Sequence, residues 1–102
     1  MDVDGLLESV SSQVGLDDYG DPTFRDGLEP LWWSGINEGD LTEIGMLAFE
    51  GQIRMNLANR LRVVDWHRTH PELAATRVEA PLVLVGMPRS GTTALSHLLA
   101  RR

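Results

Sequence analysis

The spacing of apolar residues divides the chain into a long helical part and a short part of another kind. Over residues 4–14, apolar side chains recur at intervals of three and four, which predicts an amphipathic helix that stops at Gly15. The longest such pattern runs from residue 41 to about residue 69, and its apolar face follows residues 53–64 at helical spacing. We therefore expect helices over most of the chain.

Capping and turn residues predict where these helices begin and end. The Asp-Pro pair at 21–22 is typical of an N-cap followed by proline at the first helical position. A helix over residues 24–32 should follow, and Pro30 should kink or shorten it. After a glycine-rich break, Asp40 or Thr42 can cap the long helix.

The pattern changes after residue 80. Residues 81–85, Pro-Leu-Val-Leu-Val, form an uninterrupted apolar run rich in β-branched side chains, as in a strand buried on both faces of a parallel sheet. Residues 86–91 read as a glycine loop, and residues 92–102 as a helix with leucines on one side. The sequence therefore predicts one strand–loop–helix unit of an α/β fold.

Composition and charge exclude several classes of protein. The chain has no cysteine, no apolar run near the ~20 residues of a membrane span, and an acidic start unlike a secretory signal, so we expect a cytoplasmic protein. A net charge of −6 argues against general affinity for nucleic acid. The charge is divided, however, since residues 1–50 carry twelve acids and one Arg, and residues 51–102 three acids and eight Arg. An anion site is therefore expected in the second half.

The loop at residues 86–93, Gly-Met-Pro-Arg-Ser-Gly-Thr-Thr, has the chemistry of an anion site. A tight turn between a strand and a helix directs backbone N–H groups into one concavity, and the helix adds the positive end of its dipole. Glycines at 86 and 91 leave room for an anion, while Arg89 adds a permanent positive charge. Hydrogen bonds to charged groups contribute ~1.5–3 kcal/mol each, so a few of them could hold a phosphosulfate.

Two common phosphate-binding motifs do not fit this loop. It has the G-x-x-x-x-G spacing of a Walker A motif, but Thr92 stands where the lysine should be, and the chain contains no lysine at all. This argues against hydrolysis of ATP or GTP, which requires that lysine. The dinucleotide pattern G-x-G-x-x-G fails as well because residue 88 is Pro, which argues against NAD.

The segment Pro-Arg-Ser-Gly-Thr-Thr at 88–93 resembles the P-[KR]-S-G-T-[TN] signature of bacterial sulfotransferases, which use 3′-phosphoadenosine-5′-phosphosulfate (PAPS). The stretch at 61–72 resembles the helical extension that precedes the strand in these enzymes. The resemblance implies a P-loop-like three-layer α/β sulfotransferase fold, here truncated. It further implies a helical N-terminal region over 1–78, with the first strand, phosphosulfate-binding loop and following helix over 79–102.

The resemblance also implies roles for the loop residues. Arg89 would be catalytic, stabilising charge on the bridging oxygen as the sulfuryl group leaves, without a metal ion. The residues that would bind the 5′-phosphate of PAPS are Pro88, Arg89, Ser90, Gly91, Thr92 and Thr93. In this family the general base and the 3′-phosphate site come later in the chain, so we expect an inactive N-terminal fragment. The acceptor would be a small molecule with a hydroxyl or amine.

Two alternatives to a sulfotransferase stay open at this point. One is an atypical P-loop kinase acting on a nucleotide or phosphate ester, which would need Mg²⁺. The other is a non-catalytic helical interaction or dimerisation element, in which the loop is a plain glycine turn. Trp32, Trp33 and the stripe at 53–64 motivate it because they would be exposed without the rest of a sheet, and a homo-oligomer would follow.

Three histidines could bind a metal ion or act as a base, but each position also has a simpler structural interpretation. His67 and His70 lie three apart, as metal ligands sometimes do, although a role at the end of the long helix is the commoner reason for such positions. His97 follows Thr93 by one helical turn and could reach the loop as a base, against the simpler reading of packing or solvent exposure.

The tryptophans at 32, 33 and 66 could line an acceptor pocket. Aromatic side chains in helices more often belong to a core, which is the reading we favour for all three.

Overall fold

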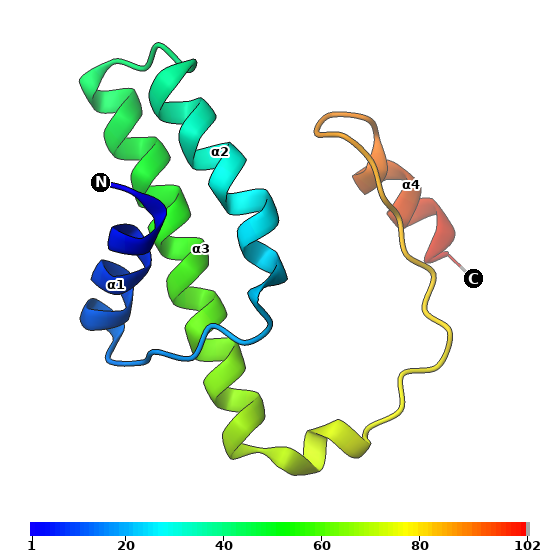
Figure 1. The fold of residues 1–102 in the computed structure, drawn as a ribbon. Helices are drawn as coiled ribbons and strands as arrows, with labels where there is room; N and C mark the ends of the chain where they lie inside the picture. Colours follow the sequence, from blue (N-terminus) through cyan, green and yellow to red (C-terminus); the bar gives the residue numbers. More distant parts are fainter. Residues whose placement is uncertain (102) are drawn as a thin grey trace.

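The computed structural model describes residues 1–101 and consists of helices and connecting segments (Figure 1). The elements in chain order are α1 (Val3–Val14), the 3₁₀ helix η1 (Pro22–Phe24), α2 (Arg25–Asn37), α3 (Glu43–Thr69), the 3₁₀ helix η2 (Pro71–Ala75) and α4 (Thr92–Leu99). Within residues 1–101, no helix is both long and apolar enough to span a bilayer. The mostly helical N-terminal region predicted from the sequence is confirmed.

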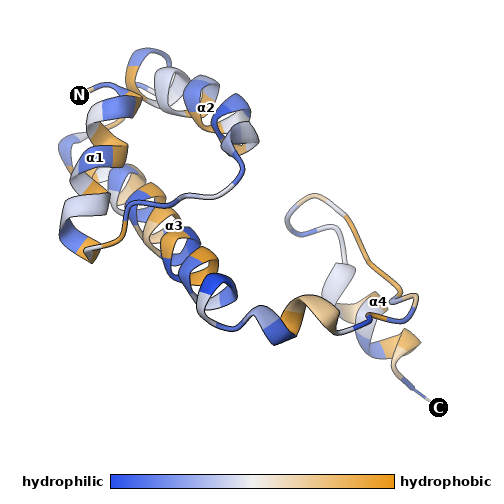
Figure 2. Ribbon diagram, turned by 60° about the horizontal axis from the view of Figure 1, so that its bottom comes forward, coloured by the Kyte–Doolittle hydropathy of each residue, from blue (hydrophilic) through white to orange (hydrophobic). Residues whose placement is uncertain are grey.

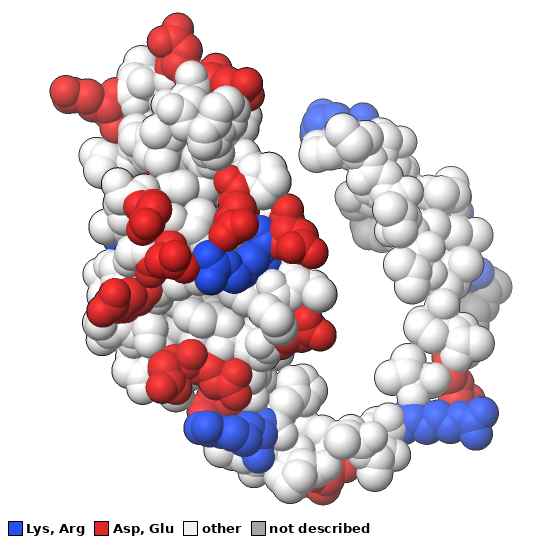
Figure 3. All heavy atoms as spheres, viewed as in Figure 1, with Lys and Arg blue, Asp and Glu red and all other residues white. Residues whose placement is uncertain are grey.

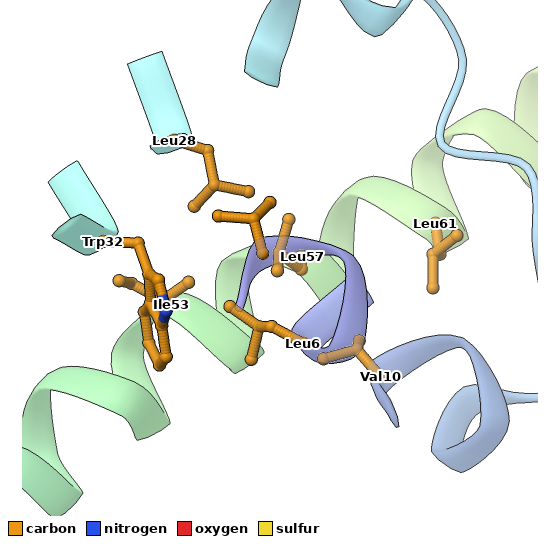
Figure 4. Packing of buried hydrophobic residues seen from close by; sticks show 8 residues of the cluster. Leu6, Val10, Leu28, Trp32, Ile53, Leu57 and Leu61 are labelled. Atoms are coloured by element: carbon orange, nitrogen blue, oxygen red, sulfur yellow. The ribbon is translucent and has the colours of Figure 1, made fainter. Parts of the chain in front are cut away.

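Helices α1, α2 and α3 pack around one apolar core (Figure 4). The eight buried side chains are Val3, Leu6 and Val10 of α1, Leu28 and Trp32 of α2, and Ile53, Leu57 and Leu61 of α3. Leu6 is fully buried and lies between the two longer helices (Figure 4). The predicted apolar face of the long helix is therefore one wall of this core.

The helix boundaries follow local signals in the sequence. Gly15 ends α1 with a left-handed φ of 80°, a conformation that glycine adopts without strain. The side chain of Thr42 accepts a hydrogen bond of 3.0 Å from the N–H of Gly45 and so caps α3. Asp21 caps η1 in the same way, accepting from Thr23 at 2.9 Å. These predicted caps are confirmed.

The effect expected of Pro30 is wrong in one respect, since α2 continues past it to Asn37. Proline removes one helical hydrogen bond and normally disfavours a helix interior. Here Leu28 and Trp32, on either side of Pro30, are both buried in the core, while Pro30 itself is exposed. Packing on the core offsets the lost hydrogen bond, so the helix is not shortened.

Gly35 lies inside α2, where it allows a close contact with α3. A Cβ at this position would overlap the ring of Phe49. The ring of Phe49 also stacks on Trp32, with ring centroids 5.9 Å apart. The glycine that the sequence suggests as part of a break is therefore a packing residue.

The connection between α1 and α2 is hydrogen-bonded to α1 and to α3. Tyr19 donates a hydrogen bond from its hydroxyl to the carbonyl of Leu7 at 2.6 Å. Arg60 of α3 donates to the carbonyls of Tyr19 and Asp21, at 2.7 Å and 3.0 Å. Its guanidinium also lies 4.4 Å from the ring centroid of Phe24. This connection is therefore part of the folded unit.

The strand predicted at 81–85 is wrong as an element, because the described residues 1–101 contain no strand. Residues 76–87 have no regular structure, and Figure 2 shows an apolar stretch there without a neighbouring strand. A strand exists only when its N–H and C=O groups pair with another strand. No residue from 76 to 101 is buried, and only Leu84 and Thr92 are partly so. Of the predicted strand–loop–helix unit, the described residues thus contain the loop and the helix α4.

Candidate functional site

The loop before α4 begins with a tight turn over Met87-Pro-Arg-Ser90. The N–H of Ser90 donates to the carbonyl of Met87 at 3.2 Å, which closes the turn. Arg89 has a φ of 66°, and a positive φ at the third residue of a turn with proline second is the signature of type II. The hydroxyl of Ser90 also donates to the Met87 carbonyl, at 2.6 Å. The turn therefore fixes the backbone around Arg89.

The first residue of the loop must be glycine for the loop to fold back on itself. A Cβ on Gly86 would lie 2.7 Å from Oγ of Ser90 and 2.8 Å from Cγ2 of Thr92. Both distances are shorter than ordinary van der Waals contact. Gly86 therefore brings the end of the extended segment against the start of α4.

The N-terminus of α4 follows directly and carries no side-chain cap. Gly91 is the N-cap residue, with a left-handed φ of 88°, and so has no side chain to bond the helix N–H groups. The first helical hydrogen bond runs from the N–H of Leu95 to the carbonyl of Gly91, at 3.0 Å. The N–H groups of residues 92–94 thus have no acceptor within the helix. They are free to bind an anion.

Arg89, Gly91, Thr92, Thr93, Ala94 and His97 line one hollow of about 560 Å³ at the surface. Four of these six residues belong to the site predicted from the sequence. The other two predicted residues do not line it: Pro88 shapes the turn, and the hydroxyl of Ser90 is bonded to the Met87 carbonyl.

His97 and Ala94 are the two lining residues outside the predicted set. The sequence did contain a signal for His97, because it follows Thr93 by four residues and helical geometry places such positions on one face. His97 is exposed, as the simpler reading predicted. It contributes a polar ring to the wall of the hollow.

The electrostatics of the hollow favour an anion. Within residues 1–101, the exposed Arg89 forms no ion pair, so its charge is not neutralised by a neighbouring carboxylate. Figure 3 shows acidic side chains over the three-helix unit and a basic group at the loop end of the C-terminal segment. The concavity thus combines free N–H groups, two threonines and an unpaired guanidinium.

The histidine that ends α3 has a structural role. His70 is the C-cap residue, and its ring stacks on Trp66 with centroids 3.7 Å apart. Its Nδ1 lies 2.9 Å from the carbonyl of Trp66. Across residues 1–101, no three His, Asp or Glu side chains gather as a metal site would require. The predicted role at the helix end is confirmed for His70.

The prediction that the tryptophans belong to the core is correct for one of the three. Trp32 is 4% exposed and lies in the core, whereas Trp33 and Trp66 are 57% and 55% exposed. The exposed pair lies on the surfaces of α2 and α3. Their exposure shows that apolar surface remains uncovered on these helices.

Comparison with known proteins agrees with the motif in the loop. No protein-family model matches this sequence, and no curated protein does. Among solved structures, the chain is similar to the crystal structure of sulfotransferase STF1 from Mycobacterium tuberculosis H37Rv, with 33% sequence identity and a TM-score of 0.83. The match covers 97% of this chain but 28% of the STF1 chain. In fold and sequence, the chain is thus similar to part of a sulfotransferase.

Proposed function

We propose that this chain provides the donor-binding part of a sulfotransferase that transfers a sulfuryl group from PAPS to a hydroxyl or amine of a small molecule. In the complete enzyme, the helical region 1–78 would precede a three-layer α/β domain that begins within residues 79–102. The similarity to a solved sulfotransferase supports this family. The finer assignment of the donor rests on the loop.

The observation that carries the proposal is that the hydrogen-bond donors of residues 89–94 converge. The positive φ angles of Arg89 and Gly91 turn the backbone so that an uncapped helix N-terminus follows at once. Arg89, both threonines and the helix start then line the same hollow. A 5′-phosphosulfate presents several charged oxygens, which match a group of N–H and O–H donors around one cation.

Each loop residue has a distinct task in this proposal. The N–H groups of residues 92–94 and the hydroxyls of Thr92 and Thr93 would bind the 5′-phosphate. Arg89 would stabilise the charge that develops on the bridging oxygen when the sulfuryl group leaves, which is worth most in the transition state. Gly86, Pro88 and Ser90 would hold the loop in shape through the contacts described above.

Titration of the ¹⁵N-labelled chain with adenosine 3′,5′-bisphosphate, followed by NMR, tests this proposal. Two or three charge-assisted hydrogen bonds give an expected Kd of about 1 mM, or about −4 kcal/mol, which NMR detects readily. We expect the amide signals of residues 89–94 to move, with or without Mg²⁺. Arg89→Ala should weaken binding only in part, because the N–H groups of residues 92–94 and the hydroxyls of Thr92 and Thr93 would still bind the 5′-phosphate. Arg77→Ala, on an exposed position outside the loop, should leave the shifts unchanged.

Two results would contradict the proposal. Tighter binding of ATP with Mg²⁺ than of the bisphosphate would favour the atypical kinase, since metal-bridged phosphates are the substrate of that class. Shifts spread over α1 to α3, with none in the loop, would show that the loop does not bind the nucleotide. We also expect negligible sulfuryl transfer by residues 1–102, since the proposal assigns them binding of PAPS and not the general base.

A further inference from the structure

The hollow beside the loop extends along α4 past the first turn of the helix. Residues 91–94 line it at the helix start, and His97 lines it one turn further on, four residues after Thr93. Helical side chains lean toward the N-terminal end of their helix, which is how the ring of His97 reaches the same hollow. Arg89 and His97 are thus the two ionisable side chains in its wall.

The ring of His97 has no partner in the protein. Within residues 1–101, the hydrogen bonds made by histidine rings belong to His70, and His97 forms no ion pair. Because His97 is exposed, its two ring nitrogens are open to a bound molecule. A histidine that acts as a general base is usually oriented by a hydrogen bond to its second nitrogen, and that bond is missing here. This favours a binding role over a role as the base.

The surroundings of His97 contain positive charge and no negative charge. Residues 80–102 include no Asp or Glu. The charged neighbours on this part of the chain are Arg89 across the hollow and Arg101 just after α4, while the segment 81–85 beside the helix adds leucines only. A bound anion would therefore be the negative partner of a protonated His97, and no carboxylate of this segment competes with it.

We propose that His97 is a second cationic group of the donor site, which contacts an anionic oxygen of the phosphosulfate when its ring is protonated. The inference rests on the proposed function, since it takes this hollow as the place where the donor lies. Histidine side chains change charge between about pH 5 and 8, so the donor should bind more tightly as the pH falls through this range. Arg89 keeps its charge throughout, so the pH dependence separates the two contributions.

Titration of the ¹⁵N-labelled full chain with adenosine 5′-phosphosulfate, followed by NMR at about pH 5.5 and about pH 8, tests this proposal. This ligand carries the phosphosulfate of the donor but no group that titrates in the range, whereas the phosphates of the 3′,5′-bisphosphate change charge near about pH 6. Exposed ion pairs are weak, so we expect a Kd about threefold to fivefold lower at the acidic pH.

Two substitutions of His97 and one control assign the effect. His97→Gln keeps a polar side chain without the charge, so its Kd should be the same at both pH values and close to that of the parent at the alkaline one. His97→Arg carries a permanent charge and should bind at both pH values as tightly as the parent does at the acidic one. The matched control, His67→Gln, changes an exposed histidine outside the hollow and should keep the pH dependence of the parent.

The outcomes separate this inference from the proposed function. A parent Kd that is equal at both pH values, a pH dependence that persists in His97→Gln, or a His97→Arg variant that binds no more tightly at alkaline pH would each overturn the role of His97. The loop would still bind the donor in each of these cases. If neither the phosphosulfate nor the bisphosphate moved the signals of residues 89–94 at either pH, the donor site itself would be wrong, and the role of His97 would fall with it.

Discussion

The two parts of this molecule are held in shape by different means. Residues 1–75 fold around a core that three helices share, and every buried side chain lies between Val3 and Leu61. Residues 76–101 contribute no buried side chain, yet they contain the candidate donor site. The helical unit therefore depends on contacts between residues far apart in sequence, and the loop depends on contacts between neighbours.

The connecting segments show the same difference. The connection from α1 to α2 is bonded to distant residues, with Tyr19 donating to Leu7 and Arg60 donating to Tyr19. Within the described chain, no hydrogen bond joins residues 77–86 to residues 1–75. The loop is closed instead by the short-range bonds between Ser90 and Met87. Damage to the core should thus leave the loop geometry intact, and the reverse should also hold.

The largest effect that separates the two parts is expected from Leu6→Ala. Leu6 is fully buried between the helices, and removing its side chain leaves a cavity that costs about 2–5 kcal/mol. For a small domain this is a large share of the total stability. Urea denaturation followed by circular dichroism measures the loss. A loss below about 1 kcal/mol would mean that the three-helix core is not the source of stability.

The success of sequence-based prediction follows the same division. Caps and stops act over a few residues, so the sequence alone placed Gly15 correctly and limited the cap of α3 to Asp40 or Thr42. The strand at 81–85 could not, because its hydrogen-bond partners must come from another segment. The end of α2 was missed for a related reason, since burial of Trp32 outweighs the local signal of Pro30.

The candidate site could be predicted from the sequence to the extent that its residues are neighbours along the chain. Arg89, Gly91, Thr92 and Thr93 share one hollow because the backbone passes from the turn straight into the helix. The hydroxyl of Ser90 donates to the Met87 carbonyl, a detail of turn geometry that no motif encodes, and the predicted binding of the donor by Ser90 is untested. The binding of PAPS stays a prediction.

A smaller effect, of about 1 kcal/mol at neutral pH, is expected from Tyr19→Phe, which removes the hydrogen bond to the Leu7 carbonyl. The variant also tests a pH dependence. Burial raises the pKa of Tyr19 above its usual value, outweighing an opposing hydrogen bond to Ser11. In the folded state, Tyr19 thus keeps its hydroxyl proton at pH values where the unfolded chain has lost it. The contribution of Tyr19 to the stability is therefore complete below about pH 10 and is lost as the pH rises through the pKa of Tyr19 in the folded state.

The composition of the chain allows the titration of Tyr19 to be measured without interference from other side chains. It has one tyrosine, no lysine and no cysteine, so Tyr19 is the one side chain with an ordinary pKa between about 8 and 11. Urea denaturation of the parent chain from about pH 8 to 11 should show stability falling at the alkaline end. Tyr19→Phe should show a flat profile over the same range. An equal decline in both proteins would mean that Tyr19 is not the group responsible.

The smallest effect is expected from Leu98→Ala in α4, the matched partner of Leu6→Ala. Leu98 is 62% exposed and touches no part of the three-helix core, so the change in unfolding free energy should lie within about 0.5 kcal/mol. Because alanine favours helices at least as well as leucine does, α4 itself should persist. Urea denaturation measures the change in unfolding free energy. The NMR signals of residues 89–94 with added bisphosphate show whether α4 persists. If Leu98→Ala destabilised the helices as strongly as Leu6→Ala, the two parts would share a core in solution, and the independence of the loop would have to be abandoned.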